Sequence, residues 1–157
     1  MAAGYNKGTT AVLAEWAAGF RLADAPVAVV DRMKALVLDL LRVVTVGAPL
    51  PWSRSVRCLA PGMDGTGNSS ILLTGERLDA GRAAFVNGAY AHPRGSPHRR
   101  MTWDELSALF KDTVAEALPA PALDRVLDLV AGLDRDTHPR DITAAFIAVP
   151  GWLDRGV

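Results

Sequence analysis

Apolar residues recur at helical spacing over most of the chain, beginning with a helix predicted over 9–22. Thr9 or Thr10 can cap the start of this helix, because a threonine hydroxyl accepts a hydrogen bond from an amide of the first turn. Its apolar positions are Val12, Leu13, Trp16 and Phe20. They follow a period of about 3.6 residues, so we expect this helix to lie on a core.

The longest apolar segment is 26–48, where a proline in the first turn marks the start of a second helix. Its core positions are Val30, Met33, Val37, Leu40, Leu41 and Val44. Its charged residues are Asp31, Arg32, Lys34, Asp39 and Arg42. These charges favour an amphipathic helix over a membrane span. After Leu36 the helix is nearly apolar on more than one face, which predicts burial on several sides.

The remaining elements are also mostly helical. Further helices are predicted over 52–59, 79–92, 102–118, 122–133 and 142–149, and a strand over 70–74. Thr102 and Glu105 form a capping box at the start of one helix. The glycines of 61–70 indicate an ordinary loop, because the lysine of a phosphate-binding loop is absent. We therefore predict an all-α fold with at most one short strand or hairpin, in a single domain over residues 1–157.

Composition narrows the range of partners. Seventeen basic and seventeen acidic residues leave no net charge, so neither nucleic acid nor a membrane surface is an expected partner. Cys58 is the single cysteine, which suits a reducing, cytoplasmic location, and we expect it to be a small buried residue. No signal peptide is recognisable. Half of the 157 residues are apolar and four are tryptophan, which predicts a homo-oligomer.

Titratable and cationic side chains gather after the helix predicted over 79–92. They are His92, Arg94, His98, Arg99 and Arg100. An imidazole can transfer protons near neutral pH and a guanidinium can bind a carboxylate, so one interpretation is a site for an anionic substrate. The alternative is a solvated basic loop, with His92 interacting with the helix dipole.

Three further observations bear on the chemistry. Asn87 and Gly88 are poor helix formers inside a predicted helix, which favours a close helix contact or a ligand there. The three histidines show no metal-ligand spacing, so neither a metal nor another cofactor is predicted. His138 is assigned to a loop. Asp39 is interpreted as structural, with an arginine or a helix terminus as its partner.

Three blocks of the sequence resemble the MmgE/PrpD family, which includes 2-methylcitrate dehydratases and cis-aconitate decarboxylases. The first block is VVDRMKALVLDLLRVVTVGAPLP, residues 29–51, with Asp39 and Gly47 in matching places. The second is TGERLDAGRAAFVNGAYAH, residues 74–92, which is similar to the family's "AAfvNGa.aH" helix. The third is RGSPHRRMTWDELSALF, residues 94–110, which resembles the start of the family's C-terminal region. The resemblance implies a helical domain.

The chain also departs from the family pattern. His92 is followed by Pro93 and Arg94 where the family has an acidic "DfDD" segment. Arg42 stands where the family usually has glycine, and Leu109 where it has lysine. The resemblance therefore implies a reduced member without the central region and the α/β lid domain, and it does not transfer the family's catalytic acid, base and lysines.

Two functions follow as hypotheses. One is a compact lyase or isomerase that acts on a small carboxylate or a biosynthetic intermediate by acid–base chemistry. Its expected catalytic residues are His92, Asn87 and His98, and its expected substrate-binding residues are Arg94, Arg99 and Arg100. The other is a noncatalytic assembly or binding module that pairs with itself or with a longer relative.

Overall fold

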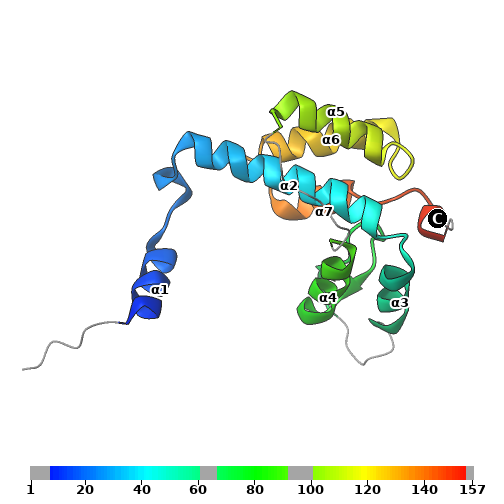
Figure 1. The fold of residues 1–157 in the computed structure, drawn as a ribbon, viewed down its shortest axis with the longest axis horizontal. Helices are drawn as coiled ribbons and strands as arrows, with labels where there is room; N and C mark the ends of the chain where they lie inside the picture. Colours follow the sequence, from blue (N-terminus) through cyan, green and yellow to red (C-terminus); the bar gives the residue numbers. More distant parts are fainter. Residues whose placement is uncertain (1–7, 61–66, 92–100, 155–157) are drawn as a thin grey trace, which may run out of the picture.

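The computed structural model describes residues 8–60, 67–91 and 101–154, and within them the chain is mostly helical (Figure 1). The α-helices are α1 (Thr9–Gly19), α2 (Val27–Gly47), α3 (Pro51–Leu59), α4 (Ala80–Tyr90), α5 (Trp103–Val114), α6 (Ala120–Ala131) and α7 (Pro139–Ala145). Single 3-10 turns, η1 (Leu22–Asp24) and η3 (Trp152–Asp154), precede α2 and follow α7. Strands β1 (Ser69–Ser70) and β2 (Arg77–Leu78) form one antiparallel hairpin, with Ser69 opposite Leu78. The all-α prediction with a single hairpin is confirmed.

Helix α2 is the central element of the fold. It packs against α4, α5 and α6, while α3 packs on α4 and α7 packs on α6 (Figure 1). Its buried positions include Leu38, Leu41 and Val44, which lie on one face of the helix. The burial expected on several sides after Leu36 is wrong for Leu40, which is exposed, and the predicted core position Met33 is exposed as well. A helical period identifies the apolar positions but not which of them a neighbour covers.

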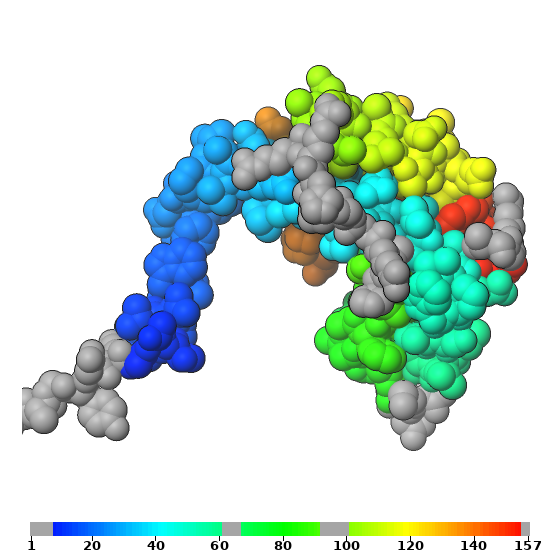
Figure 2. Space-filling model, in the orientation of Figure 1, coloured from blue at the N-terminus to red at the C-terminus, as the bar shows by residue number. Residues whose placement is uncertain are grey.

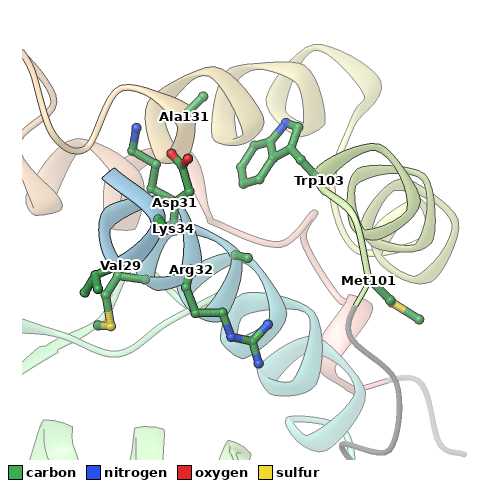
Figure 3. Close-up of a pocket in the computed structure, with 10 residues that line it drawn as sticks. Val29, Asp31, Arg32, Lys34, Met101, Trp103 and Ala131 are labelled. Carbon is green, nitrogen blue, oxygen red and sulfur yellow. The ribbon is translucent and has the colours of Figure 1, made fainter. Parts of the chain in front are cut away.

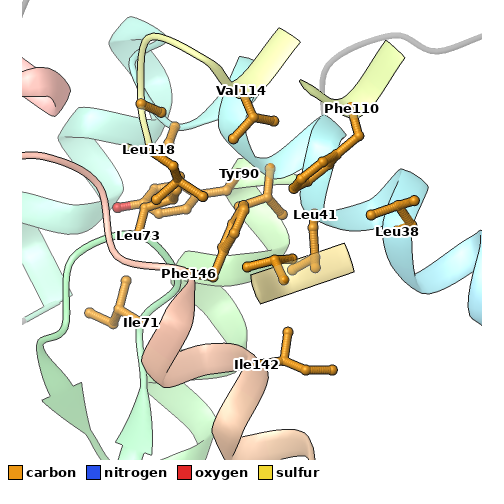
Figure 4. Close-up of a cluster of buried hydrophobic side chains, with 14 of the residues drawn as sticks. Leu38, Leu41, Ile71, Leu73, Tyr90, Phe110, Val114, Leu118, Ile142 and Phe146 are labelled. Carbon is orange, nitrogen blue, oxygen red and sulfur yellow. The ribbon is translucent and has the colours of Figure 1, made fainter. Parts of the chain in front are cut away.

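The largest fully buried side chains are Tyr90, Phe110 and Phe146 (Figure 4). The rings of Phe110 and Phe146 are stacked with their centroids 6.4 Å apart, so α5 is joined to the end of α7 through the core. The backbone after α7 then adds to the hairpin region. The Leu73 amide donates to the Phe146 carbonyl at 3.0 Å, and the Ala148 amide donates to the Leu73 carbonyl at 2.8 Å. These bonds fix the C-terminal segment between elements distant in sequence.

Several predicted helix bounds change. Helix α1 ends at Gly19 and its N-cap is Gly8, not Thr9 or Thr10. Helix α5 ends at Val114 rather than at residue 118, and the Ala117 and Leu118 amides both donate to the Val114 carbonyl in the turn that follows. Helix α7 begins at Pro139, three residues before the predicted start.

The environments of α1 and Cys58 also differ from the predictions. Helix α1 has no buried residue and does not lie on the core. Cys58 is exposed, because α3 packs on α4 through the side that carries the buried Ser53. No helix in the described ranges is long and apolar enough to cross a membrane.

Candidate functional site

The C-terminal end of α4 is held by hydrogen bonds with the hairpin and with α3. The Asn87 amide nitrogen donates to the Ser70 carbonyl at 3.1 Å, and its oxygen accepts from the Leu72 amide at 2.9 Å. The Ser53 hydroxyl of α3 donates to the Ala89 carbonyl at 3.2 Å. Both ends of the Asn87 side chain are therefore bonded to the hairpin backbone, which accounts for an asparagine inside this helix.

Gly88, the other poor helix former, has a different environment. A Cβ atom built on Gly88 meets no heavy atom within 4 Å, so no close contact in the described structure requires a glycine there. The contact expected for the pair Asn87 and Gly88 is thus made by Asn87 alone, and its partner is a hairpin rather than another helix.

Tyr90 lies in the core one turn beyond Val86. Its side chain is fully buried, and its hydroxyl has no hydrogen-bond partner in the described residues. Burial raises the pKa of Tyr90 to about 12, a shift opposed by the nearby Arg57 guanidinium. The hydroxyl is therefore protonated at neutral pH.

The other predicted site residues follow α4 in the sequence. His92, Arg94, His98, Arg99 and Arg100 lie outside the described residues. Asn87 is the one candidate whose surroundings are described. Its amide is engaged by the backbone, and it does not line the open pocket described next.

An open pocket of about 800 Å³ lies where the first half of α2 meets the start of α5 and the end of α6 (Figure 3). Trp103 and Asp31 lie on the same side of α2, and Arg32 extends from another side of the helix (Figure 3). Met101, which also lines the pocket, is the first described residue after the gap at 92–100. The pocket is thus lined by the segment that follows the predicted basic cluster in the sequence.

Two cations of this pocket differ in their partners. Lys34 Nζ lies 2.6 Å from Asp134 Oδ1, and this hydrogen bond lowers the pKa of the Asp134 carboxyl. Arg32 is exposed and has no ion pair with another described residue. A guanidinium can bind a carboxylate through two parallel hydrogen bonds, so Arg32 can receive an acidic ligand.

Sequence reasoning treated Arg32 and Lys34 only as charges that interrupt an apolar helix. The spacing of apolar residues along α2 does not predict that Trp103 lies near this helix, because that contact depends on how α5 docks on α2. His138 also has a more definite role than predicted. Its Nδ1 accepts from the Arg140 amide at 3.2 Å and caps α7.

The predicted partner of Asp39 is present. Asp39 Oδ1 accepts from Nε and Nη2 of Arg42 at 3.0 and 2.8 Å, which supports the structural interpretation. In the described part of the chain, no group of three or more His, Cys, Asp or Glu side chains is arranged to hold a metal ion.

Comparison with known proteins identifies a family for this sequence. The family model "MmgE/PrpD N-terminal domain" matches residues 11–93, more than half of the 157 residues. A cis-aconitate decarboxylase of Aspergillus terreus strain NIH 2624 is 31% identical over 85 residues, which are 54% of this chain and 17% of that protein. A second Aspergillus terreus cis-aconitate decarboxylase is 30% identical over 85 residues, again 17% of its length. No solved structure matches.

Proposed function

Because the chain belongs to the MmgE/PrpD family, we propose that it acts as a lyase on a small carboxylic acid. The observation that carries this proposal is the family match itself, which includes α4 and ends at residue 93. His92 follows Tyr90 by two residues in the sequence. The C-terminal end of α4 is fixed by hydrogen bonds of Asn87 and Ser53. A general base needs such a fixed backbone to meet its substrate in one geometry.

The open pocket supports an acidic substrate. Arg32 supplies a cation without an ion-pair partner in the described residues, and Trp103, on another side of α2, supplies an apolar surface of the same pocket. A carboxylate of the substrate would pair with Arg32, with further cations from Arg94, Arg99 or Arg100. The second carboxylate of a di- or tricarboxylic acid could then lie at the reacting centre.

The proposed reaction follows from the relatives' name, cis-aconitate decarboxylase. One carbon–carbon bond breaks and a carboxylate leaves as carbon dioxide. The electron pair stays on the substrate, where a neighbouring carboxylate can accept the charge, and His92 in its protonated form donates a proton to carbon. For a hydroxy acid the same imidazole, when neutral, would remove the proton next to a carboxylate while hydroxide leaves.

Incubation with cis-aconitate tests the proposal. Proton NMR should show conversion, and calorimetry should show saturable binding. His92→Ala should abolish conversion, whereas Arg32→Met should weaken binding about tenfold or more, since a hydrogen bond to a charged group is lost. Arg125→Met is the matched control, because Arg125 is an exposed arginine outside the pocket. Equal binding by Arg32→Met and the control, or no conversion of cis-aconitate or a hydroxylated analogue, would refute the site.

A noncatalytic module is the second candidate. It is favoured by Asn87, whose amide is committed to backbone bonds. The match covers 17% of the length of each decarboxylase. Saturable binding without conversion would support this candidate over the lyase.

A further inference from the structure

An apolar cavity of about 170 Å³ lies where the linker before α2 meets the first half of that helix. Figure 2 shows this linker leaving the body of the molecule at the start of α2, with α1 beyond it. The linker lines the cavity with Phe20, Leu22 and Ala25, and the segment after α6 lines it with Leu133. Residues from three parts of the chain, α2 included, therefore surround one apolar space.

The two polar residues of the cavity wall are paired with each other. They are Lys34 and Asp134, whose Nζ and Oδ1 atoms lie 2.6 Å apart. The other described lining residues are apolar, and those of α2 are Val29, Val30, Met33 and Val37. A dry apolar cavity of about 150 Å³ holds a benzene-sized group, so this cavity has room for about six carbon atoms of a hydrocarbon group.

The cavity adjoins the open pocket that contains Arg32. Val29, Met33 and Lys34 line both spaces. Val29 also precedes Arg32 by three residues, and residues at this spacing are neighbours on a helix surface, with their Cβ atoms about 5–6 Å apart. A ligand that is held at Arg32 can therefore extend over Val29 into the cavity.

The charges of the open pocket favour a ligand with one carboxylate. Arg32 and Lys34 are its cations among the described residues, and the Lys34 ammonium is already paired with Asp134. Asp31 lines the same pocket and has no ion pair with another described residue. Because the Asp31 carboxylate repels further anions, the one unpaired guanidinium suits a single carboxylate better than three.

We infer that the substrate of this site is a carboxylic acid that carries an alkyl chain. Its carboxylate pairs with Arg32, its chain crosses Val29, and about six carbon atoms of the chain fill the cavity. This inference rests on the proposed function and narrows its substrate class. Of the two proposed reactions, removal of a proton next to a carboxylate with loss of hydroxide needs only one carboxylate, and it is the reaction that such an acid supports.

Calorimetry with straight-chain acids from butanoate to decanoate tests the role of the chain. Each added CH₂ group that enters the cavity should tighten binding about fourfold, and the gain should stop once the cavity is full. The longer acids should therefore bind more tightly than cis-aconitate. Equal affinity along the series would overturn the inference and would show that another surface fills the cavity.

Ala25→Phe tests the cavity directly, because a phenyl ring at this lining position would occupy the space. The gain per CH₂ group should disappear, whereas butanoate should bind as before. Ala84→Phe is the matched control, since Ala84 is an exposed alanine of α4 outside both spaces. Val29→Asn places a polar group at an exposed position of the cavity wall and should reduce the gain. Circular dichroism confirms that each variant is folded, and a gain that both cavity variants leave unchanged would overturn the inference.

Arg32→Met separates the carboxylate from the chain. It should weaken the binding of every acid in the series by the same factor, about tenfold, and leave the gain per CH₂ group intact. Saturable binding of cis-aconitate without a gain along the series would refute the alkyl acid and leave the proposed lyase. A clear gain along the series without conversion of any acid would refute the lyase and leave the alkyl-acid site.

Discussion

The Asn87 side chain of α4 accepts a hydrogen bond of 2.9 Å from the Leu72 amide, and so joins a helix to a hairpin 15 residues earlier in the chain. The Ser70 carbonyl accepts a second bond from the same side chain at 3.1 Å. Because Asn87 supplies both a donor and an acceptor, it pairs two backbone groups that β2 does not reach.

Replacing Asn87 by alanine should destabilise the fold. The Leu72 amide and the Ser70 carbonyl would lose their partners, so we expect the free energy of unfolding to fall by about 2 kcal/mol or more. Urea denaturation measures this change, and faster hydrogen exchange at the Leu72 amide would locate it. Asn68→Ala is the control, because Asn68 is exposed and, among the described residues, its backbone carbonyl is the group that is hydrogen-bonded. Equal stability of the two variants would contradict the structural role of Asn87.

Local signals in the sequence predicted local structure well. The capping box is present, with the Glu105 amide donating to the Thr102 hydroxyl at 3.2 Å and the Thr102 amide donating to the Glu105 carboxylate at 2.9 Å. Asp39 likewise has its arginine partner three residues away. Such contacts depend on residues within one turn, which periodicity and capping rules describe.

Contacts distant in sequence could not be predicted in the same way. The Leu73 amide bonds to the Phe146 carbonyl, and no pattern in either segment points to the other. The same limit explains α1. Helical spacing identified its apolar positions correctly, but it could not show that this helix lies away from the core. In the candidate site, the positions of Arg32 and Trp103 depend on how α5 docks on α2.

Two glycines should respond to alanine in opposite directions. Gly88→Ala should raise the free energy of unfolding by about 0.5–1 kcal/mol, because the added Cβ meets no atom within 4 Å and alanine favours helix. Gly67→Ala should lower it by about 1–3 kcal/mol, because the added Cβ would collide with the Leu78 carbonyl and the Asp79 amide. Thermal and urea unfolding measure both effects. A destabilised Gly88→Ala would indicate a contact at this helix surface that the described residues do not provide.

Tyr90 should make the fold sensitive to alkali. Its pKa is about 12 in the folded chain against 10.0 ordinarily, so the folded state holds its proton more tightly than the unfolded state. The stabilising contribution is therefore complete below pH 10 and is lost as the pH rises toward 12, by up to about 1.4 kcal/mol per pH unit.

Tyr90→Phe isolates this effect. It removes a buried hydroxyl that has no partner in the described residues, so the stability at pH 7 should stay the same or rise by up to about 1 kcal/mol. The difference between wild type and variant should then grow in favour of the variant above pH 10, as followed by urea unfolding at each pH. A constant difference from pH 7 to pH 12 would contradict the raised pKa.

The ion pair between Lys34 and Asp134 should be visible in a carboxyl titration. The Lys34 hydrogen bond at 2.6 Å lowers the pKa of Asp134 from its ordinary 3.8, so the NMR midpoint of this carboxyl should lie below 3.8. Any stabilisation from the pair is present above pH 3.8 and is lost as the pH falls through the lowered pKa. The side chains are partly exposed, so 1 M salt should reduce the shift.

Lys34→Met should return the Asp134 midpoint toward 3.8, since the hydrogen bond that is the largest cause of the lowered pKa is then absent. Lys111→Met is the matched control, because it breaks the separate pair of Lys111 with Asp124, 2.7 Å apart, between α5 and α6. An Asp134 midpoint that moves equally in both variants would show that general charge, rather than the Lys34 contact, controls this carboxyl. A midpoint that moves in Lys34→Met alone would place Lys34 beside Asp134 in solution and leave Arg32 as the cation available to an acidic ligand in the open pocket.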